Sequence, residues 1–181
     1  MNKSLVLTGM MGVGKSTIGR LLAKRLKIKF IDVDKIIEKN EKKTIKQIFD
    51  ENGEKYFRKL EKKITLKLLK NKKTVVALGG GAFINNEIRY RVLKTSVSVW
   101  LKVSLDELHK RYRRNDNRPL LNKKKLDKEV RDIYLSRKKI YSLADFKINC
   151  DNIGKGKIVD KILDFYANKS TQSKRLFNNN R

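Results

Sequence analysis

The chain has 181 residues, a length that fits one globular domain with a substantial buried core. Lys and Arg number 46 against 19 Asp and Glu, which gives a formal net charge of +27. Its apolar runs are too short to span a membrane, its first residues lack a secretory pattern, and one cysteine, Cys150, cannot form an internal disulfide. These features exclude a membrane-spanning protein and a disulfide framework, and we expect a cytoplasmic protein.

The positive charge has two explanations. A protein that binds nucleic acid or an anionic surface would use such a charge to concentrate phosphates around itself. The alternative, which we favour, is that Lys, Asn and Ile are abundant together, as an AT-rich coding sequence would produce, with the lysines on solvated helix faces. The lysines are spread over 24–73 and 102–161 without the interleaved aromatic residues that a base-stacking surface needs. We therefore expect no specific nucleic-acid partner and no membrane partner.

Short apolar strands alternate with helical segments, the pattern of a parallel sheet covered on both faces. The expected strands are 5–7, 30–33, 74–78, 96–103 and 146–149. The expected helices are 17–26, 44–49, 56–69, 87–94, 105–114, 125–140 and 157–167. We expect one α/β domain over residues 1–167 and a loosely ordered, polar and basic tail over 168–181.

The first strand leads into a glycine-rich loop with the sequence GMMGVGKST at residues 9–17, and a helix follows. The glycines let successive backbone N–H groups turn toward an anion, and the helix N-terminus adds its partial positive charge. Lys15 is placed to reach the outer phosphates of a nucleotide, and Ser16 to offer its hydroxyl to Mg²⁺. The strand, the loop and the helix together predict a phosphate-binding P-loop.

Two carboxylates, Asp32 and Asp34, end the second expected strand. Side chains two residues apart on a strand point the same way, so we expect both to project near the carboxyl ends of the strands. Ligands bind at that edge in open α/β sheets. An alternative for Asp34 is that it caps the next helix, which does not exclude a catalytic role.

The third expected strand ends in Gly79, Gly80 and Gly81, where a P-loop protein would normally have an aspartate associated with Mg²⁺. Without side chains, a small substrate can approach the backbone N–H groups. This suggests that Asp32 takes over the role beside the metal and that an acceptor molecule binds next to the glycines. A flexible hinge is the other interpretation of the triplet.

Three arginines are candidate anion-binding residues. Arg58 and Glu61 are spaced i, i+3 on one helix and can meet on one face. Arg118 precedes the only proline, within a segment at 113–125 that is rich in charge and interrupts two helices, which is typical of a mobile lid. Arg137, near the end of the last long helix before the fifth strand, is the third candidate.

Together these residues resemble the shikimate kinase family. The motifs that carry the resemblance are Gly9–Arg20 (GMMGVGKSTIGR), Asp32–Asp34, Phe57–Glu61 (FRKLE), Gly79–Ala82, Asn117–Leu121 (NRPLL), and Arg137 with Tyr141, Ala144 and Asp145. The resemblance implies a P-loop NTPase fold of the nucleoside-monophosphate-kinase type, with a five-stranded parallel sheet flanked by helices and a mobile lid. It also implies transfer of the ATP γ-phosphate to the 3-hydroxyl of shikimate, on the route to chorismate.

The resemblance assigns roles to individual residues. It implies that Lys15, Asp34 and Arg118 are catalytic. The implied ATP-binding residues are Gly12, Val13, Gly14, Lys15, Ser16, Thr17, Arg118 and Arg111, the last lying against adenine. The implied shikimate-binding residues are Asp34, Arg58, Gly79, Gly80, Gly81 and Arg137, with Glu61 orienting Arg58. Mg²⁺ would be contacted directly by Ser16 and through water by Asp32.

Two positions depart from the family pattern. Ile88 stands where asparagine is usual, and Lys139 replaces a common proline between Arg137 and Tyr141, which affects the expected angle of Arg137. Two other functions stay open as alternatives. One is a kinase for another small carboxylated polyol such as gluconate, and the other is a basic, nucleotide-switched protein that binds nucleic acid. We expect ATP and shikimate as partners and a monomeric protein.

Overall fold

A five-stranded parallel sheet forms the centre of the structure, a computed structural model that describes the backbone of residues 3–114 and 123–178. The strands are β1 (Ser4–Thr8), β2 (Lys29–Asp32), β3 (Thr74–Ala77), β4 (Ser96–Lys102) and β5 (Phe146–Asn149). They are arranged in the order β2-β3-β1-β4-β5, and each neighbouring pair is parallel. This confirms the predicted α/β fold class.

The central strands are buried on both faces, which explains their continuous apolar sequences. Leu5, Val6 and Leu7 of β1 are all 0% exposed, and β3 is buried along its whole length. The outer strands β2 and β5 each have one buried residue and expose a lysine, Lys29 and Lys147. Helices must therefore cover both faces of the sheet.

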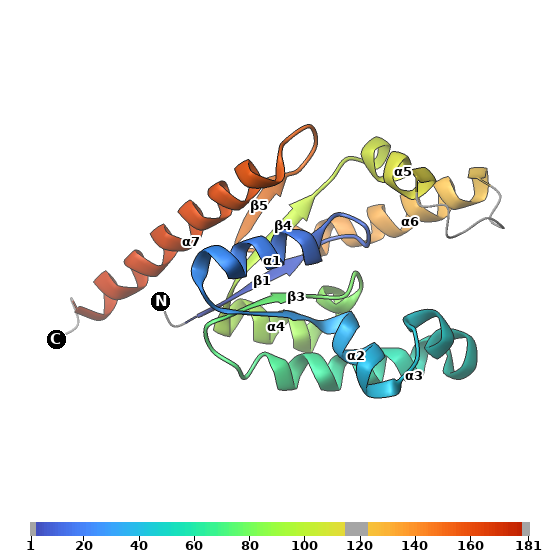
Figure 1. The fold of residues 1–181 in the computed structure, drawn as a ribbon, viewed down its shortest axis with the longest axis horizontal. Coiled ribbons are helices and arrows are strands. Elements are labelled where there is room, and N and C mark those ends of the chain that lie inside the picture. The colour runs from blue at the N-terminus through green and yellow to red at the C-terminus, as the bar shows by residue number, and fades with distance from the viewer. Residues whose placement is uncertain (1–2, 115–122, 179–181) are drawn as a thin grey trace.

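Figure 1 shows how the helices are distributed around the sheet. On one face lie α1 (Lys15–Leu26) and α7 (Lys155–Asn178), which also contact each other, and α4 (Asn86–Thr95) covers the opposite face. Two pairs of helices extend beyond the carboxyl ends of the strands, α2 (Val33–Glu41) with α3 (Ile45–Leu68) and α5 (Leu105–Arg114) with α6 (Lys123–Tyr141). A short 3₁₀ helix, η1 (Ala82–Ile84), follows β3. The P-loop and the glycine triplet thus lie between the two helix pairs.

Helix α2 begins directly after β2, so the expectation that Asp32 and Asp34 both end a strand is wrong for Asp34. Asp32 is the residue before the helix, in extended conformation, and its carboxylate accepts a hydrogen bond from the backbone N–H of Lys35. Capping satisfies a backbone donor that the first helical turn leaves unpaired. Asp34 therefore lies in the first turn of α2, and Asp32 is the capping residue.

Helix α3 spans the two helices expected at 44–49 and 56–69 and bends between them. Thr44 caps its start, and the side chain of Gln47 reciprocates by accepting from the backbone N–H of Thr44. Inside the span, Gly53 has φ of 77° and ψ of 169°, a conformation that glycine adopts without a Cβ clash. The interruption between the two expected helices was predicted correctly, but the chain bends at Gly53 without a separate loop.

Helix α7 continues through Asn178, past the expected end at residue 167. Its first half is anchored by buried Ile158, Ile162 and Tyr166, and Lys169 forms an ion pair with Asp145. Once a helix is anchored, each added residue extends it at low cost, and the following residues include good helix formers. The backbone at 168–178 is thus helical, which differs from the expected loose tail.

The described residues contain no helix long and apolar enough to cross a membrane. Of the expected lid at 113–125, the backbone at 113–114 ends α5 and that at 123–125 begins α6. Residues 115–122, including Arg118, lie outside the described residues.

Two helical glycines provide a test of the packing between α1 and the sheet. A Cβ on Gly19 would lie 2.4 Å from an edge carbon of the Phe30 ring, whereas a Cβ on Gly156 in α7 would meet nothing within 4 Å. We expect Gly19→Ala to lower the free energy of unfolding by about 1–3 kcal/mol, because overpacking outweighs helix propensity. Gly156→Ala should instead raise it by a few tenths to about 1 kcal/mol. Urea unfolding measures both, and a stabilising Gly19→Ala would contradict the described contact.

Candidate functional site

The P-loop connects β1 to α1, and its glycines adopt backbone angles that other residues rarely take. Gly9, Gly12 and Gly14 have φ values of 134°, 75° and 97°, and Gly14 is the residue before α1. These turns bring the loop back across the helix N-terminus, where unpaired N–H groups and the helix dipole favour an anion. The backbone thus has the form expected of a phosphate-binding loop.

Lys15 is held inside this loop by two backbone carbonyls. Its Nζ donates to the carbonyl oxygens of Gly9 at 2.9 Å and Met10 at 2.8 Å, and the residue is 8% exposed. Burial lowers the pKa of Lys15 to about 8, against an opposing effect of Asp34 and Asp32. The ammonium is therefore partly desolvated and poised beside the loop that would hold phosphates.

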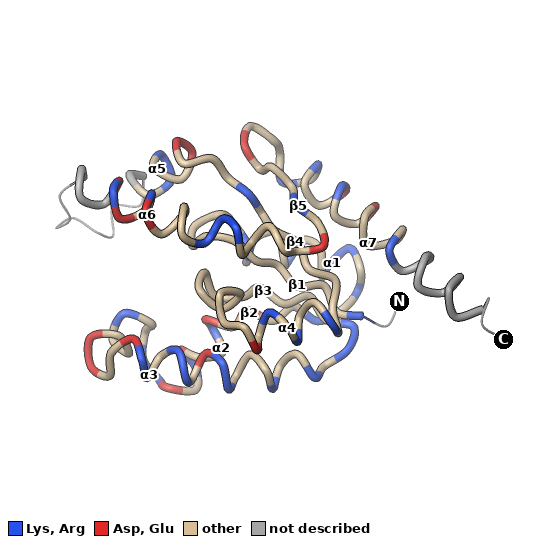
Figure 2. Tube along the Cα trace, turned by 180° about the vertical axis from the view of Figure 1, so that it is seen from behind, with Lys and Arg blue, Asp and Glu red and all other residues tan. Residues whose placement is uncertain are grey.

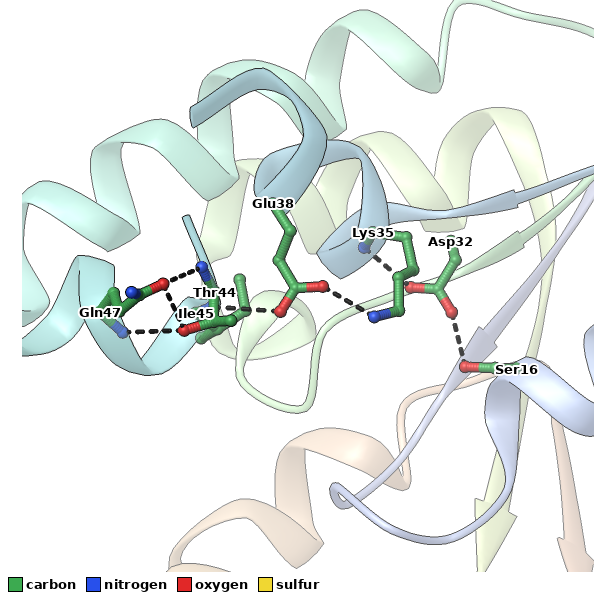
Figure 3. A network of polar contacts seen from close by, with 7 residues as sticks. All are labelled: Ser16, Asp32, Lys35, Glu38, Thr44, Ile45 and Gln47. Carbon is green, nitrogen blue, oxygen red and sulfur yellow. Dashed lines mark hydrogen bonds and ion pairs between the residues drawn. The ribbon is translucent and has the colours of Figure 1, made fainter. Parts of the chain in front are cut away.

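A chain of hydrogen bonds runs from the P-loop helix to the start of α3 (Figure 3). The Ser16 hydroxyl donates to Oδ2 of Asp32 at 2.6 Å, and the other carboxylate oxygen accepts from the N–H of Lys35 at 3.3 Å. The Lys35 Nζ donates to Glu38 at 2.8 Å, and Glu38 in turn accepts from the N–H of Ile45 at 3.2 Å. The helix pair α2–α3 is thus connected by hydrogen bonds to the first turn of α1.

Ser16 and Asp32 have the oxygen donors that Mg²⁺ prefers, and they lie together at the loop. Within residues 3–112 and 127–169, no group of three or more His, Cys, Asp or Glu could hold a metal ion by itself. Mg²⁺ commonly keeps several waters and binds one or two protein oxygens plus phosphates. The residues present therefore fit a magnesium ion that arrives with a nucleotide.

Two carboxylates lie close to the first residue of the glycine triplet. A Cβ on Gly79 would lie 2.5 Å from Oε1 of Glu61 and 2.6 Å from Oδ1 of Asp34. Burial raises the pKa of Asp34 and that of Glu61. The charge of Asp32 adds to the upward shift of Asp34, and the charge of Asp34 adds to that of Glu61. Among the described residues, Oε1 of Glu61 has no hydrogen-bond partner. A polar acceptor thus remains available beside the glycine.

The other two glycines also have close neighbours. A Cβ on Gly80 would lie 3.1 Å from the backbone nitrogen of Met11, and one on Gly81 would lie 2.6 Å from Nη1 of Arg58. None of the three has a positive φ. The triplet is therefore glycine because its neighbours approach so closely, which explains it without a hinge.

Arg58 meets Glu61 as the i, i+3 spacing predicts. Its Nη1 donates to Oε2 of Glu61 at 2.8 Å, and its Nε donates to Glu54 at 3.1 Å. The Glu61 side chain is 3% exposed, so this ion pair is shielded from water on one side. The Phe57 ring centroid lies 5.1 Å from the guanidinium carbon and restricts it further. Arg58 is thus held in one orientation above Gly81.

Arg137 approaches the same triplet from the opposite helix pair. Its Nη1 donates to the carbonyl oxygen of Gly80 at 3.2 Å. Of the two positions that depart from the family pattern, Lys139 is exposed and continues α6 as regular helix, and Ile88 is fully buried in α4. Two guanidinium groups, from α3 and α6, therefore converge on three consecutive glycines next to the P-loop.

Comparison with known proteins identifies this arrangement. The profile of the Shikimate kinase family matches residues 11–167. The chain belongs to the shikimate kinase family. The shikimate kinase of Persephonella marina is 41% identical over 161 residues, which covers 89% of this chain and 97% of the relative. The structure of the Acinetobacter baumannii shikimate kinase in complex with shikimate matches with a TM-score of 0.85 and 32% identity, over 92% of this chain and 94% of that one.

Family membership confirms the expected function class, an ATP-dependent kinase with shikimate kinase activity. A gluconokinase structure from Sinorhizobium meliloti matches with a TM-score of 0.58 at 15% identity and covers 95% of both chains. That likeness shows a shared fold alone. The findings therefore favour the shikimate kinase reading over the gluconate alternative.

The two arginines expected to bind ATP differ in what the structure describes of them. Arg111 donates from Nη1 to the carbonyl oxygen of Val13 at 3.2 Å and from Nε to Glu107 at 2.8 Å, so it lies against the P-loop. Its contact with adenine stays a prediction. Arg118 lies outside the described residues, and its role also stays a prediction.

Two tyrosine hydroxyls also reach the site. The sequence placed Tyr141 in the family motif but assigned a role to neither hydroxyl. Tyr112 donates to the carbonyl oxygen of Met11 at 2.8 Å, and Tyr141 donates to that of Gly80. The partners are 101 and 61 residues apart in the chain, and such contacts leave no local spacing pattern. For Tyr141, the available signals were its place in the family motif and its position one helical turn after Arg137.

The burial of Lys15 predicts a pH dependence of stability. A folded-state pKa near 8, below the ordinary value of 10.5, means that the folded protein binds this proton less tightly than the unfolded chain does. Lys15 therefore destabilises the fold below pH 8, and this cost disappears as the pH rises toward 10.5. We expect Lys15→Met to be more stable than the parent at pH 7, with the gap narrowing by up to about 1.4 kcal/mol per pH unit within that window.

Urea unfolding of both proteins at a series of pH values provides the measurement, and the difference between them removes the titration of all other groups. A gap that stays constant from pH 7 to pH 10 would show that Lys15 has an ordinary pKa in the fold.

Proposed function

We propose that this chain transfers the γ-phosphate of ATP to the 3-hydroxyl of shikimate. The observation that supports it most is the convergence of Asp34, Arg58 and Arg137 on residues 79–81, directly beside the P-loop. Two guanidinium groups can bind a substrate carboxylate through ion pairs, and the Asp34 carboxylate can accept a hydrogen bond from a substrate hydroxyl. A small acid with hydroxyl groups matches that combination.

On the nucleotide side, the backbone of Gly12, Val13, Gly14, Ser16 and Thr17 would hold the phosphates, and Lys15 would neutralise the charge that develops on them. Phosphoryl transfer needs positioning and charge compensation more than covalent help from the protein. Arg118 is proposed to contact the transferred phosphate. Ser16 directly, and Asp32 through water, would hold Mg²⁺, which would offset the negative charge of the phosphates.

On the acceptor side, Asp34 would accept a hydrogen bond from the 3-hydroxyl. Its pKa is raised by burial, so the carboxylate is a better proton acceptor than an exposed one. Arg58 and Arg137 would bind the carboxylate of shikimate, with Glu61 fixing Arg58. The bare backbone of 79–81 would line the same pocket. The proposal also includes a monomeric state and a cytoplasmic location.

Shikimate-dependent release of ADP is the direct test. We expect turnover with ATP, Mg²⁺ and shikimate, and loss of it in Lys15→Met, because the developing phosphate charge then lacks its buried ammonium. Phosphorus NMR of the product identifies the phosphorylated hydroxyl. Gluconate serves as the matched acceptor, and faster turnover with gluconate than with shikimate would support the alternative kinase.

The nucleic-acid alternative makes a different prediction in the same assay. Figure 2 shows Lys and Arg along each labelled helix of the described chain rather than on one element, with Asp and Glu among them on the helices other than α1. Charge spread in this way supports weak binding that falls steeply with salt. Added DNA or RNA should therefore leave turnover unchanged at physiological salt, and saturable stimulation there would favour the alternative.

Arg58→Lys tests the acceptor site by itself. A lysine cannot reproduce the planar grip on a carboxylate or the two contacts to Glu54 and Glu61, so we expect shikimate binding to weaken about 10- to 100-fold. The affinity for ADP should change little. Arg25→Lys is the matched control, because Arg25 is exposed near the far end of α1. Calorimetric titration measures both ligands, and equal shikimate affinity for Arg58→Lys and the parent would remove Arg58 from the site.

A further inference from the structure

Two tyrosine hydroxyls reach into the site, and the proposed mechanism uses neither. Tyr141 lies on α6 and donates to the carbonyl oxygen of Gly80, and Tyr112 lies on α5 and donates to that of Met11. Each tyrosine thus fastens one of the two loops that would hold the substrates. The two loops also touch each other, since a Cβ on Gly80 would lie 3.1 Å from the nitrogen of Met11.

Tyr141 is fixed before it makes its hydrogen bond. It is 0% exposed, its ring centroid lies 5.9 Å from that of Trp100, and its hydroxyl also lies 3.9 Å from the sulfur of Met10. The Gly80 carbonyl therefore accepts from a side chain that cannot follow it if the loop moves. The same carbonyl accepts from Arg137, so Tyr141 and Arg137 share one acceptor.

The two hydrogen bonds to the Gly80 carbonyl affect the pocket proposed for shikimate. In a trans peptide the C=O and the following N–H point in opposite directions, and the described residues contain no cis bond. Holding the Gly80 carbonyl toward α6 therefore turns the N–H of Gly81 away from α6, while the Arg58 guanidinium packs against the Cα of Gly81. Tyr141 thereby fixes the peptide plane on which both arginines converge.

Tyr112 acts on the P-loop in the same manner. Its hydroxyl lies 2.8 Å from the Met11 carbonyl oxygen, and its ring would lie 3.8 Å from a Cβ on Gly12. The next peptide N–H, that of Gly12, must then point away from the Tyr112 hydroxyl. Gly12 has φ of 75°, and a glycine with this freedom needs an external contact to hold one orientation.

We propose that Tyr141 and Tyr112 are positioning residues, Tyr141 for the acceptor pocket and Tyr112 for the phosphate loop. Neither hydroxyl touches a reacting atom. Each removes the rotational freedom of a glycine peptide plane before the substrate arrives, so that the substrate need not order the loop itself. This inference rests on the proposed function, because it assigns one tyrosine to each of the two proposed substrates.

Two variants, Tyr141→Phe and Tyr112→Phe, each measured with both substrates, test the proposal. Phenylalanine keeps the ring and its packing and removes only the hydroxyl, and a net hydrogen bond corresponds to about a 2- to 10-fold change in an equilibrium constant. We expect Tyr141→Phe to raise the KM for shikimate by about that factor and to leave the KM for ATP unchanged. Tyr112→Phe should raise the KM for ATP and leave that for shikimate unchanged.

Tyr166→Phe is the matched control. Tyr166 is 2% exposed and also donates to one backbone carbonyl, that of Lys3 before β1, at the opposite end of the sheet. We expect a lower free energy of unfolding with both KM values unchanged. Urea unfolding of all three variants compares their stability, and titration with shikimate and with MgADP repeats the comparison without turnover.

The outcomes separate this inference from the proposed function. A parent protein without shikimate-dependent turnover contradicts the proposed function. An active parent with variants whose KM values match it, or rise equally for both substrates, overturns the positioning roles. If Tyr141→Phe unfolds too easily to assay, titration of this variant with shikimate at low temperature still tests the role of Tyr141. The KM values of Tyr112→Phe test the role of Tyr112.

Discussion

The site depends on close approach to three consecutive glycines. Two carboxylates, the backbone of the P-loop and a guanidinium all lie so near the backbone of residues 79–81 that a Cβ at any of the three positions would be crowded. Protein interiors transmit such crowding because they are packed as densely as organic crystals. Strands β1 and β3 are neighbours in the parallel sheet, with Leu7 paired to Ala77. The P-loop and the glycine triplet that follow them therefore lie against each other.

The two helix pairs contribute different side chains to the site. The pair α2–α3 supplies acidic side chains and one arginine, and it is connected to Ser16 through Asp32, Lys35 and Glu38 (Figure 3). The pair α5–α6 supplies contacts to backbone carbonyls, from Arg111, Tyr112, Arg137 and Tyr141. The first pair brings carboxylates and Arg58 to the glycine triplet, and the second brings Arg137 to it and donates to carbonyls of both loops.

The sequence was sufficient to predict the features that have a local signal. The P-loop, the glycine triplet, the Arg58–Glu61 spacing and the five strands each follow from residues close together in the chain. Helix α2 was not among the predicted helices, because Asp32 both ends β2 and caps the helix, so no turn residues separate the two. The tyrosine contacts were missed because their carbonyl partners are far away in the chain and any residue type supplies a carbonyl.

The buried lysine also affects the heat measured when a nucleotide binds. With a pKa of about 8, Lys15 is only about half protonated at that pH, and a polyanion beside it would favour the charged form. Binding near pH 8 should therefore draw about half a proton from the solution for each nucleotide bound. The binding enthalpy would then depend on the ionisation enthalpy of the buffer, so calorimetry in two buffers counts the protons that Lys15 takes up.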